Sequence, residues 1–147
     1  LLSAREMNID PSSRILSLAA LSHLYGLFTL HMSLAAGATS HLLPAFNPGN
    51  LTSDLTTANA THIYAAPAHF VPVVAQGLPS SLFENTSLVC LSGAAVSPQL
   101  AREVDDLLIN GAVVQLWGMS SRVKAAPPAI SLGSGALRSW KGPKKGA

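Results

Sequence analysis

The chain has 147 residues, enough for one domain with a modest core, and is 48% hydrophobic but only 11% charged, where about a quarter is usual. Its single cysteine, Cys90, excludes a disulfide framework and a cysteine metal site. The most apolar segment, 24–38, is shorter than the roughly 20 residues of a membrane span and predicts a buried helix. No basic stretch precedes an apolar run at the start, so we expect no signal peptide and a cytoplasmic location.

The net charge of +2 conceals two segments of opposite sign. Residues 1–120 contain three basic and seven acidic side chains, whereas residues 121–147 contain six basic and none that are acidic. The second segment also holds Pro127-Pro128 and scattered glycines, without apolar periodicity. We therefore divide the chain into a folded body, 1–120, and a basic tail, 121–147, which we expect to be disordered and of unrelated origin.

Apolar patterning and turn residues predict the elements along the body. The first six residues read as the end of a helix. We expect strands over 14–20, 38–43, 61–65, 87–91 and 112–116. Between them we expect helices over 24–36, ended by Gly37, over 51–59 after a turn at 47–50, and over 68–76, which Pro72 keeps short or kinked. The last helix is opened by Ser97-Pro98 and ended by Gly111.

Alternating strands and helices predict an α/β fold with a mostly parallel sheet covered by helices. The apolar composition also fits a fragment whose partner surfaces are missing. In parallel sheets, ligands bind in the loops that follow the carboxyl ends of the strands. Those loops are 21–26, 65–69, 92–96 and 117–121.

Three of these loops carry phrases that point to chemistry: His23-Leu24-Tyr25-Gly26, Ser92-Gly93-Ala94-Ala95, and Gln115-Leu116-Trp117-Gly118-Met119-Ser120. Each also has a structural explanation. A histidine before a helix often caps or packs against it. A small-residue loop can let a helix approach a strand closely, or expose backbone N–H groups to an anion or ribose. An aromatic side chain such as Trp117 can belong to the core or stack on a base.

In this order and spacing, the three phrases resemble the AMP-forming acyl-CoA synthetases, the adenylate-forming ligase family. The resemblance covers about 13–120 and includes Leu34-Ala35-Ala36-Gly37-Ala38-Thr39 and Thr61-His62-Ile63-Tyr64-Ala65-Ala66-Pro67. It implies part of the large N-terminal domain of an enzyme that uses ATP and Mg²⁺ to convert a fatty or aryl acid to an acyl-adenylate, and then coenzyme A to form a thioester.

The resemblance also implies roles for individual residues. His23, Tyr25 and Gly93 would line the acyl pocket. The nucleotide contacts would come from Gly93, Ala94, Ala95, Gln115, Trp117, Gly118, Met119 and Ser120. The Ser120 hydroxyl would take the catalytic place of a threonine that contacts the phosphate, and Trp117 the place of a tyrosine against the adenine.

The sequence departs from the family pattern at Ser121, where a Mg²⁺-binding glutamate is expected. A hydroxyl is a weaker metal ligand than a carboxylate, so we assign no metal ligand. The Gly-rich phosphate loop, the ribose-binding aspartate and the C-terminal lysine are also absent. The break in motif coincides with the change in charge, which suggests that the tail derives from another reading frame or a retained intron.

Besides a general doubly wound nucleotide-binding protein, which has no G-x-G-x-x-G motif after a strand to support it, three functions remain open on the sequence alone. The first is an inactive fragment of a carboxylate–CoA ligase. The second is a non-catalytic nucleotide- or acyl-binding module that associates through exposed apolar surface. The third, a nucleic-acid binder acting through the basic tail, has little support, because the tail has no helical pattern and only Trp140 as an aromatic. We therefore expect no nucleic-acid partner.

Overall fold

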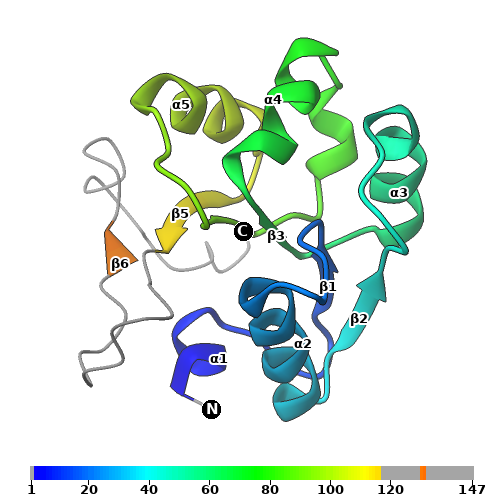
Figure 1. Cartoon of the computed structure of the whole chain (residues 1–147), viewed down its shortest axis with the longest axis vertical. Helices are drawn as coiled ribbons and strands as arrows, with labels where there is room; N and C mark the ends of the chain where they lie inside the picture. Colours follow the sequence, from blue (N-terminus) through cyan, green and yellow to red (C-terminus); the bar gives the residue numbers. More distant parts are fainter. Residues whose placement is uncertain (1, 117–129, 132–147) are drawn as a thin grey trace, which may run out of the picture.

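The structure is a computed structural model that describes residues 2–116 and 130–131 (Figure 1). The strands are β1 (Arg14–Ser17), β2 (Thr39–Leu42), β3 (His62–Ala65), β4 (Leu88–Leu91), β5 (Ala112–Leu116) and β6 (Ile130–Ser131). The helices are α1 (Leu2–Glu6), α2 (Leu24–Ala36), α3 (Leu51–Ala58), α4 (Pro67–Ala75) and α5 (Pro98–Leu107), with 3₁₀ turns over Pro48–Asn50 and Ser80–Phe83. The predicted alternation of strands and helices is confirmed.

All the strands belong to one sheet with the order β2-β1-β3-β4-β5-β6. β1 to β5 pair in parallel, as predicted, whereas β6 pairs antiparallel with β5. After β2 the chain crosses back over β1 to form β3, so the direction of winding reverses between β1 and β3. With right-handed crossovers, such a reversal moves the following helices to the opposite face. Accordingly α2 lies on one face with α1, and α3, α4 and α5 lie on the other (Figure 1).

Each face of the sheet has its own hydrophobic core. Leu16 and Val89 point into the larger core beneath α3, α4 and α5. The neighbouring residues Ile15 and Cys90 point into the smaller core beneath α1 and α2. Burial on both faces explains why the inner strands are apolar at nearly every position.

The amino end of β3 is held by a buried polar cluster. His62 is 3% exposed; its Nε2 lies 2.9 Å from the carbonyl oxygen of Met7 and its Nδ1 2.8 Å from the Thr61 hydroxyl. The Tyr64 hydroxyl donates to the Met7 sulfur at 2.9 Å. Burial lowers the pKa of His62, which keeps the imidazole neutral in this structural role.

The expectation that the apolar segment 24–38 forms a buried helix is only partly met: α2 has the predicted ends, Leu24 and Ala36, but it is buried on one face alone. α2 packs on the sheet through Met32 and three small residues, Gly26, Thr29 and Ser33. The two hydroxyls are satisfied inside the helix: Thr29 donates to the Tyr25 carbonyl at 2.6 Å and Ser33 to the Thr29 carbonyl at 2.9 Å. Because the small residues allow the closest approach to the sheet, they occupy the buried face.

Three of the four leucines of α2 are therefore exposed on the side away from the sheet. Leu24 and Leu34 are 66% and 69% exposed, and Leu27 is 41% exposed. Together with the uncharged sequence of this helix, they form an apolar outer face. The apolar composition thus reflects both a sheet buried on two sides and an uncovered helix face.

The helix opened by Ser97-Pro98 ends earlier than predicted. Its last residue is Leu107, and Leu108 takes an extended conformation that leaves its side chain only 9% exposed. Gly111 does not cap the helix. A Cβ at Gly111 would lie 2.5 Å from the Thr86 carbonyl oxygen, so glycine permits close approach of two chain segments.

The remaining differences are small. α4 begins at Pro67 and continues through Pro72 for nine residues. Each of the first four strands is shorter than predicted. The predicted tail lies outside the described residues except for Ile130–Ser131, which form β6. Within the part of the chain that the structure describes, no helix is long and apolar enough to cross a membrane.

Candidate functional site

The carboxyl ends of the parallel strands meet at one edge of the sheet. The register places Ser17 beside Tyr64 and Tyr64 beside Cys90, and Leu91 beside Gln115. The loops that follow β1, β3 and β4 therefore leave the sheet side by side. The first two sequence phrases, which start at His23 and Ser92, are brought to the same edge, as predicted.

The reversal of winding lies between β1 and β3 at this edge. Where consecutive crossovers run in opposite directions, their loops separate and leave a crevice above the carboxyl ends of the strands. Loop 18–23 after β1 and Ala66 after β3 border that position. The reversal makes this edge the candidate site, independently of the motifs.

His23 occupies the N-cap position of α2, but its imidazole makes no capping hydrogen bond. The side chain is exposed beside the carboxyl end of β1. Neither structural explanation, capping or packing, accounts for this histidine. It is free to contact a ligand.

Tyr25 connects the first phrase to the second. Its hydroxyl donates to the Cys90 carbonyl oxygen at 2.9 Å, across 65 residues of sequence. Its ring meets the ring of Tyr64 edge-on, with centroids 6.1 Å apart and planes inclined at 65°. Tyr25 thus reaches from the first turn of α2 across β3 to the end of β4.

The loop after β4 begins with a tight change of direction. Ser92 N–H donates to the Ala65 carbonyl at 3.0 Å, and Gly93 follows with φ +90°, a conformation that favours glycine. Gly93, Ala94 and Ala95 are exposed. The loop ends at Ser97, whose hydroxyl accepts the Leu100 N–H at 3.1 Å and caps α5 as predicted. An exposed backbone of small residues beside a helix N-terminus can approach a phosphate or a ribose.

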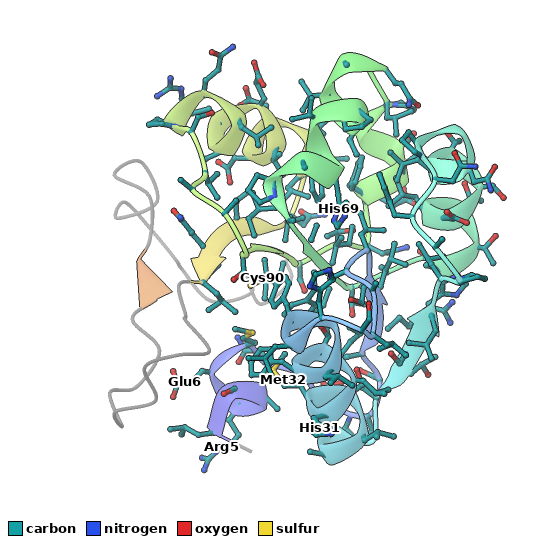
Figure 2. All side chains as sticks on the ribbon, viewed as in Figure 1. Arg5, Glu6, His31, Met32, His69 and Cys90 are labelled. Carbon is teal, nitrogen blue, oxygen red and sulfur yellow. The ribbon has the colours of Figure 1, made fainter. Side chains whose placement is uncertain are left out.

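His69, in the first turn of α4 after β3, is a further candidate site residue, and the sequence motifs do not include it. Ala66 N–H donates to its Nδ1 at 3.1 Å, so the neutral ring carries its proton on Nε2. The ring packs on Phe46 with centroids 4.6 Å apart, and burial lowers the pKa of His69. Figure 2 shows His69 and Cys90 near the middle of the molecule, whereas His31 lies farther along α2. Ala66 is the N-cap residue of α4, and its methyl side chain cannot accept a hydrogen bond. A histidine three residues later, which can accept from the Ala66 N–H, is the sequence feature that could have indicated His69.

The third phrase is only partly described. Gln115 is half-buried on β5, opposite Leu91 of β4. Trp117, Gly118, Met119 and Ser120 lie outside the described residues, as does Ser121. The roles expected of these residues therefore remain predictions.

The described residues do not fit a bound Mg²⁺. No group of three or more His, Cys, Asp or Glu side chains that could hold a metal is found in residues 2–116. The loops after β1, β3 and β4 contain no carboxylate: the acidic residues stand elsewhere, at Glu6, Asp10, Asp54, Glu84, Glu103, Asp105 and Asp106. Since Mg²⁺ is usually held by carboxylate oxygens together with phosphates, we derive no step through a metal.

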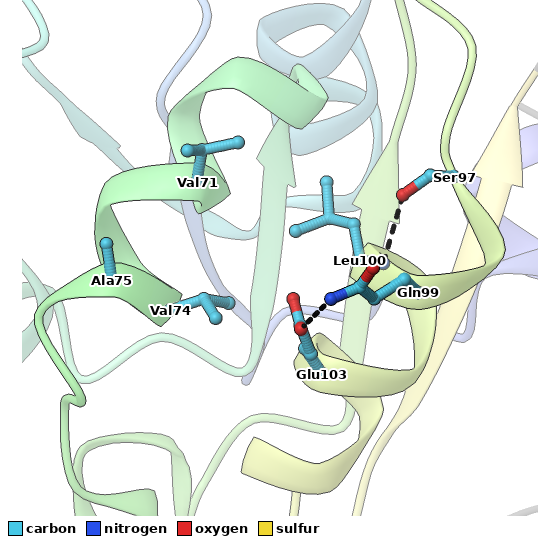
Figure 3. A pocket seen from close by; sticks show the side chains of 7 residues that line it. All are labelled: Val71, Val74, Ala75, Ser97, Gln99, Leu100 and Glu103. Atoms are coloured by element: carbon cyan, nitrogen blue, oxygen red, sulfur yellow. Dashed lines mark hydrogen bonds between the residues drawn. The ribbon is translucent and has the colours of Figure 1, made fainter.

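A groove lies between α4 and α5 (Figure 3). Its volume is about 330 Å³, and it is lined by Val71, Val74, Ala75, Ser97, Gln99, Leu100 and Glu103. Gln99 donates to the Glu103 carboxylate at 2.9 Å on the rim of the groove. The walls are largely apolar, so the groove offers few polar contacts for a ligand.

The family described as AMP-binding enzyme matches residues 2–123 of this chain. The match begins before residue 13 and extends slightly beyond Ser120, into the segment assigned to the tail. No protein among the curated sequences matches the chain.

Solved structures share the fold at low sequence identity. A long-chain-fatty-acid-CoA ligase, FadD1, from Archaeoglobus fulgidus aligns with a TM-score of 0.64 at 16% identity, over 81% of this chain and 27% of its own. ATP-bound MatB from Rhodopseudomonas palustris aligns with a TM-score of 0.65 at 23% identity, over 76% and 22%. FmoA3, a nonribosomal peptide synthetase, aligns with a TM-score of 0.70 at 20% identity, over 79% and 13%. The chain thus spans less than a third of each of these structures.

Proposed function

Because the chain belongs to the AMP-binding enzyme family, we propose that it is part of an adenylate-forming enzyme that activates a carboxylic acid with ATP. A carboxylate oxygen of the acid attacks the α-phosphorus, the bond from this phosphorus to the oxygen bridging the β-phosphate breaks, and pyrophosphate leaves. The product is a mixed anhydride of the acid and AMP. The observation that carries the proposal is the convergence of the His23 loop and the exposed Gly93–Ala95 loop on one sheet edge, within the matched segment.

The second step that we propose is transfer of the acyl group to coenzyme A. The thiolate sulfur attacks the acyl carbon and AMP leaves, which gives a thioester. The three loop phrases that resemble acyl-CoA synthetases support this step. The similarity in fold to a long-chain-fatty-acid-CoA ligase from Archaeoglobus fulgidus is consistent with it. The nonribosomal peptide synthetase shows the fold in another kind of enzyme, so the acceptor thiol needs its own test.

We assign this chain the acid-facing and adenine-facing loops of such a site. His23 and Gly93 face the acid, and the Gly93–Ala95 backbone faces the nucleotide. From the resemblance, Trp117 stacks on the adenine and the Ser120 hydroxyl contacts the α-phosphate. The reaction also needs cationic side chains or a metal ion to neutralise the phosphates. The described loops at the strand ends contain no such groups. We therefore expect the isolated chain to bind substrates but not to turn them over.

Titration of the ¹⁵N-labelled chain with AMP and with ATP, in the absence of metal, tests the binding proposal. The amide signals of Gly93–Val96 and of residues near His23 should shift together, whereas those of α3 should not. Unchanged signals at saturating nucleotide would refute it. ATP–pyrophosphate exchange should stay at background for any carboxylic acid, and robust exchange would refute the proposed inactivity.

A second candidate is a non-catalytic module that binds nucleotide or acyl chains and associates with another protein or a second copy. The exposed leucines of α2 favour it, because large apolar faces are usually covered in the working protein. Sedimentation at several concentrations separates the two candidates. A monomer at all concentrations would count against association.

A further inference from the structure

Tyr25 makes a contact that its expected place in an acyl pocket does not explain. Its hydroxyl is bonded to the Cys90 carbonyl oxygen at 2.9 Å, and its half-buried ring packs in the core between α2 and the sheet. A phenol in this arrangement has already used its donor proton on the protein backbone. Little of the side chain remains to recognise a substrate.

The Tyr25 hydroxyl keeps its proton over the whole physiological pH range. Burial is the main cause that raises the pKa of Tyr25 above its usual value, with smaller contributions from Cys90 and Tyr64. The hydroxyl therefore remains protonated and remains a donor.

The Cys90 carbonyl lies close in sequence to the Gly93–Ala95 loop, so the Tyr25 bond bears on the position of that loop. Cys90 is the last residue but one of β4, and Gly93 makes its left-handed turn three residues later. The bond from Ser92 N–H to the Ala65 carbonyl at 3.0 Å also holds this segment to β3, and Leu91 pairs with Gln115 of β5. The start of the Gly93–Ala95 loop is thus held to the neighbouring strands by strand pairing and to α2 by Tyr25.

The same tyrosine also stands two residues after His23. α2 is fixed against the loop before it, because a Cβ at Gly26 would lie 2.3 Å from the Ala20 carbonyl oxygen. The Tyr25 ring therefore moves with the His23 loop. One hydrogen bond joins the acid-facing and nucleotide-facing loops of the proposed site.

We infer that Tyr25 is a positioning residue that sets the Gly93–Ala95 loop relative to the His23 loop, rather than a wall of the acyl pocket. This inference rests on the proposed function for its effect on ligand affinity, but not for its effect on the loop itself. Without the bond, the end of β4 keeps its strand pairing, but the loop beyond it loses its hydrogen bond to α2.

The test compares Tyr25→Phe with Tyr64→Phe in the full chain. Both changes remove one hydroxyl that donates a hydrogen bond at 2.9 Å, from Tyr25 to Cys90 and from Tyr64 to Met7. Only the first bond leads to the Gly93 loop, so Tyr64→Phe controls for the general loss of stability. Chemical unfolding of both variants checks that they lose similar stability.

Two readouts are needed. In ¹⁵N relaxation, the heteronuclear NOE of Gly93–Val96 should fall in Tyr25→Phe and stay at the wild-type value in Tyr64→Phe. The affinity for AMP should fall about fivefold in Tyr25→Phe, the effect of one typical hydrogen bond, and change less than twofold in Tyr64→Phe.

Equal relaxation of the loop in wild type and Tyr25→Phe, or equal loosening by both variants, overturns the inference. If the wild-type chain does not bind AMP, the proposed function fails while the relaxation readout still decides the role of Tyr25. Loosening confined to Tyr25→Phe supports the inference in either case.

Discussion

Gly26 of α2 faces the carbonyl oxygen of Ala20 so closely that a Cβ at position 26 would lie 2.3 Å from that oxygen. No heavy-atom contact of that length is tolerated, and the obstacle is backbone rather than a mobile side chain. The absence of one methyl group therefore fixes how α2 packs against the loop after β1. That loop carries His23 into the candidate site.

Gly26→Ala should destabilise the fold by about 1–3 kcal/mol, because α2 must move away from residues 19 and 20. The usual gain of about 1 kcal/mol for alanine within a helix offsets only part of this cost. Urea unfolding followed by circular dichroism measures the difference. Gly49→Ala is the control, since its Cβ would meet only the Asn47 side-chain oxygen at 3.3 Å; equal stability of the two variants would contradict the packing argument.

Gly93→Ala should weaken nucleotide binding through the backbone rather than through a clash. The nearest atom to the added Cβ is that of Ala66 at 4.0 Å, but φ is +90°, so alanine costs about 1–2 kcal/mol or turns the loop. Gly77→Ala is matched to it, with φ +60° and no atom within 4 Å, and it lies outside the candidate loops. Calorimetric titration with AMP should show lower affinity for Gly93→Ala alone; similar affinities for both variants would remove the loop from the site.

Ser97→Ala should cost about 1 kcal/mol, because α5 loses the side-chain acceptor for the Leu100 N–H. Ser97→Asp should restore most of the loss, since a carboxylate also caps the helix and interacts favourably with its dipole. Thermal unfolding of the three proteins at one ionic strength is sufficient. If Ser97→Asp is as destabilising as Ser97→Ala, the capping hydrogen bond is not what Ser97 contributes to stability.

Stability should depend on pH through the two histidines whose pKa is lowered by burial, His62 and His69. As pH falls below about 6.5, the unfolded chain takes up these protons before the folded chain does. The free energy of unfolding should thus be constant above that pH, decrease below it, and level off once the folded histidines are protonated. Urea unfolding at pH 7.5 and 5.5 measures this slope.

His62→Gln should reduce the slope more than His69→Gln, because His62 is almost completely buried whereas His69 is partly exposed. His31→Gln, at an exposed position of α2, controls for the loss of any histidine. A wild-type protein equally stable at both pH values would show that burial of His62 carries no such penalty.

Leu24→Gln combined with Leu34→Gln should lower self-association without loss of stability, since both side chains are more than 60% exposed. Sedimentation velocity over a range of concentrations measures the change. Val71→Gln, on the rim of the α4–α5 groove and also exposed, tests whether that surface contributes instead. An unchanged distribution in the double variant would exclude the α2 face as the contact.

The sequence predicted the order of elements well because each has a local cause. Ser97-Pro98 starts α5 by capping, and Gly37 ends α2 in the left-handed conformation, with φ 70°. Apolar runs marked the strands, and alternation with helices was enough to predict parallel pairing. A glycine in the sequence can indicate either a helix end or a close approach of two chain segments. Gly111 predicts a helix end, but in the structure it permits a close contact with residue 86.

The faces of α2 and the internal contacts of the site could not be predicted in the same way. Which side of α2 is buried depends on close approach at Gly26, a tertiary contact that hydrophobicity does not report. The Tyr25–Cys90 bond spans 65 residues, and no local pattern encodes it. His69 is recognisable only once the Ala66 N–H is seen to need an acceptor.

The place of β1 in the sheet determines when the site can exist during folding. β1 pairs with β3 as well as β2, and the bond from Arg14 N–H to the Thr61 hydroxyl beside this pairing spans 47 residues. Closing so long a loop is slow compared with forming the neighbouring strand–helix–strand units. We therefore expect the junction of β1 and β3 to form late, and the candidate site, which lies above it, to appear only with the completed sheet.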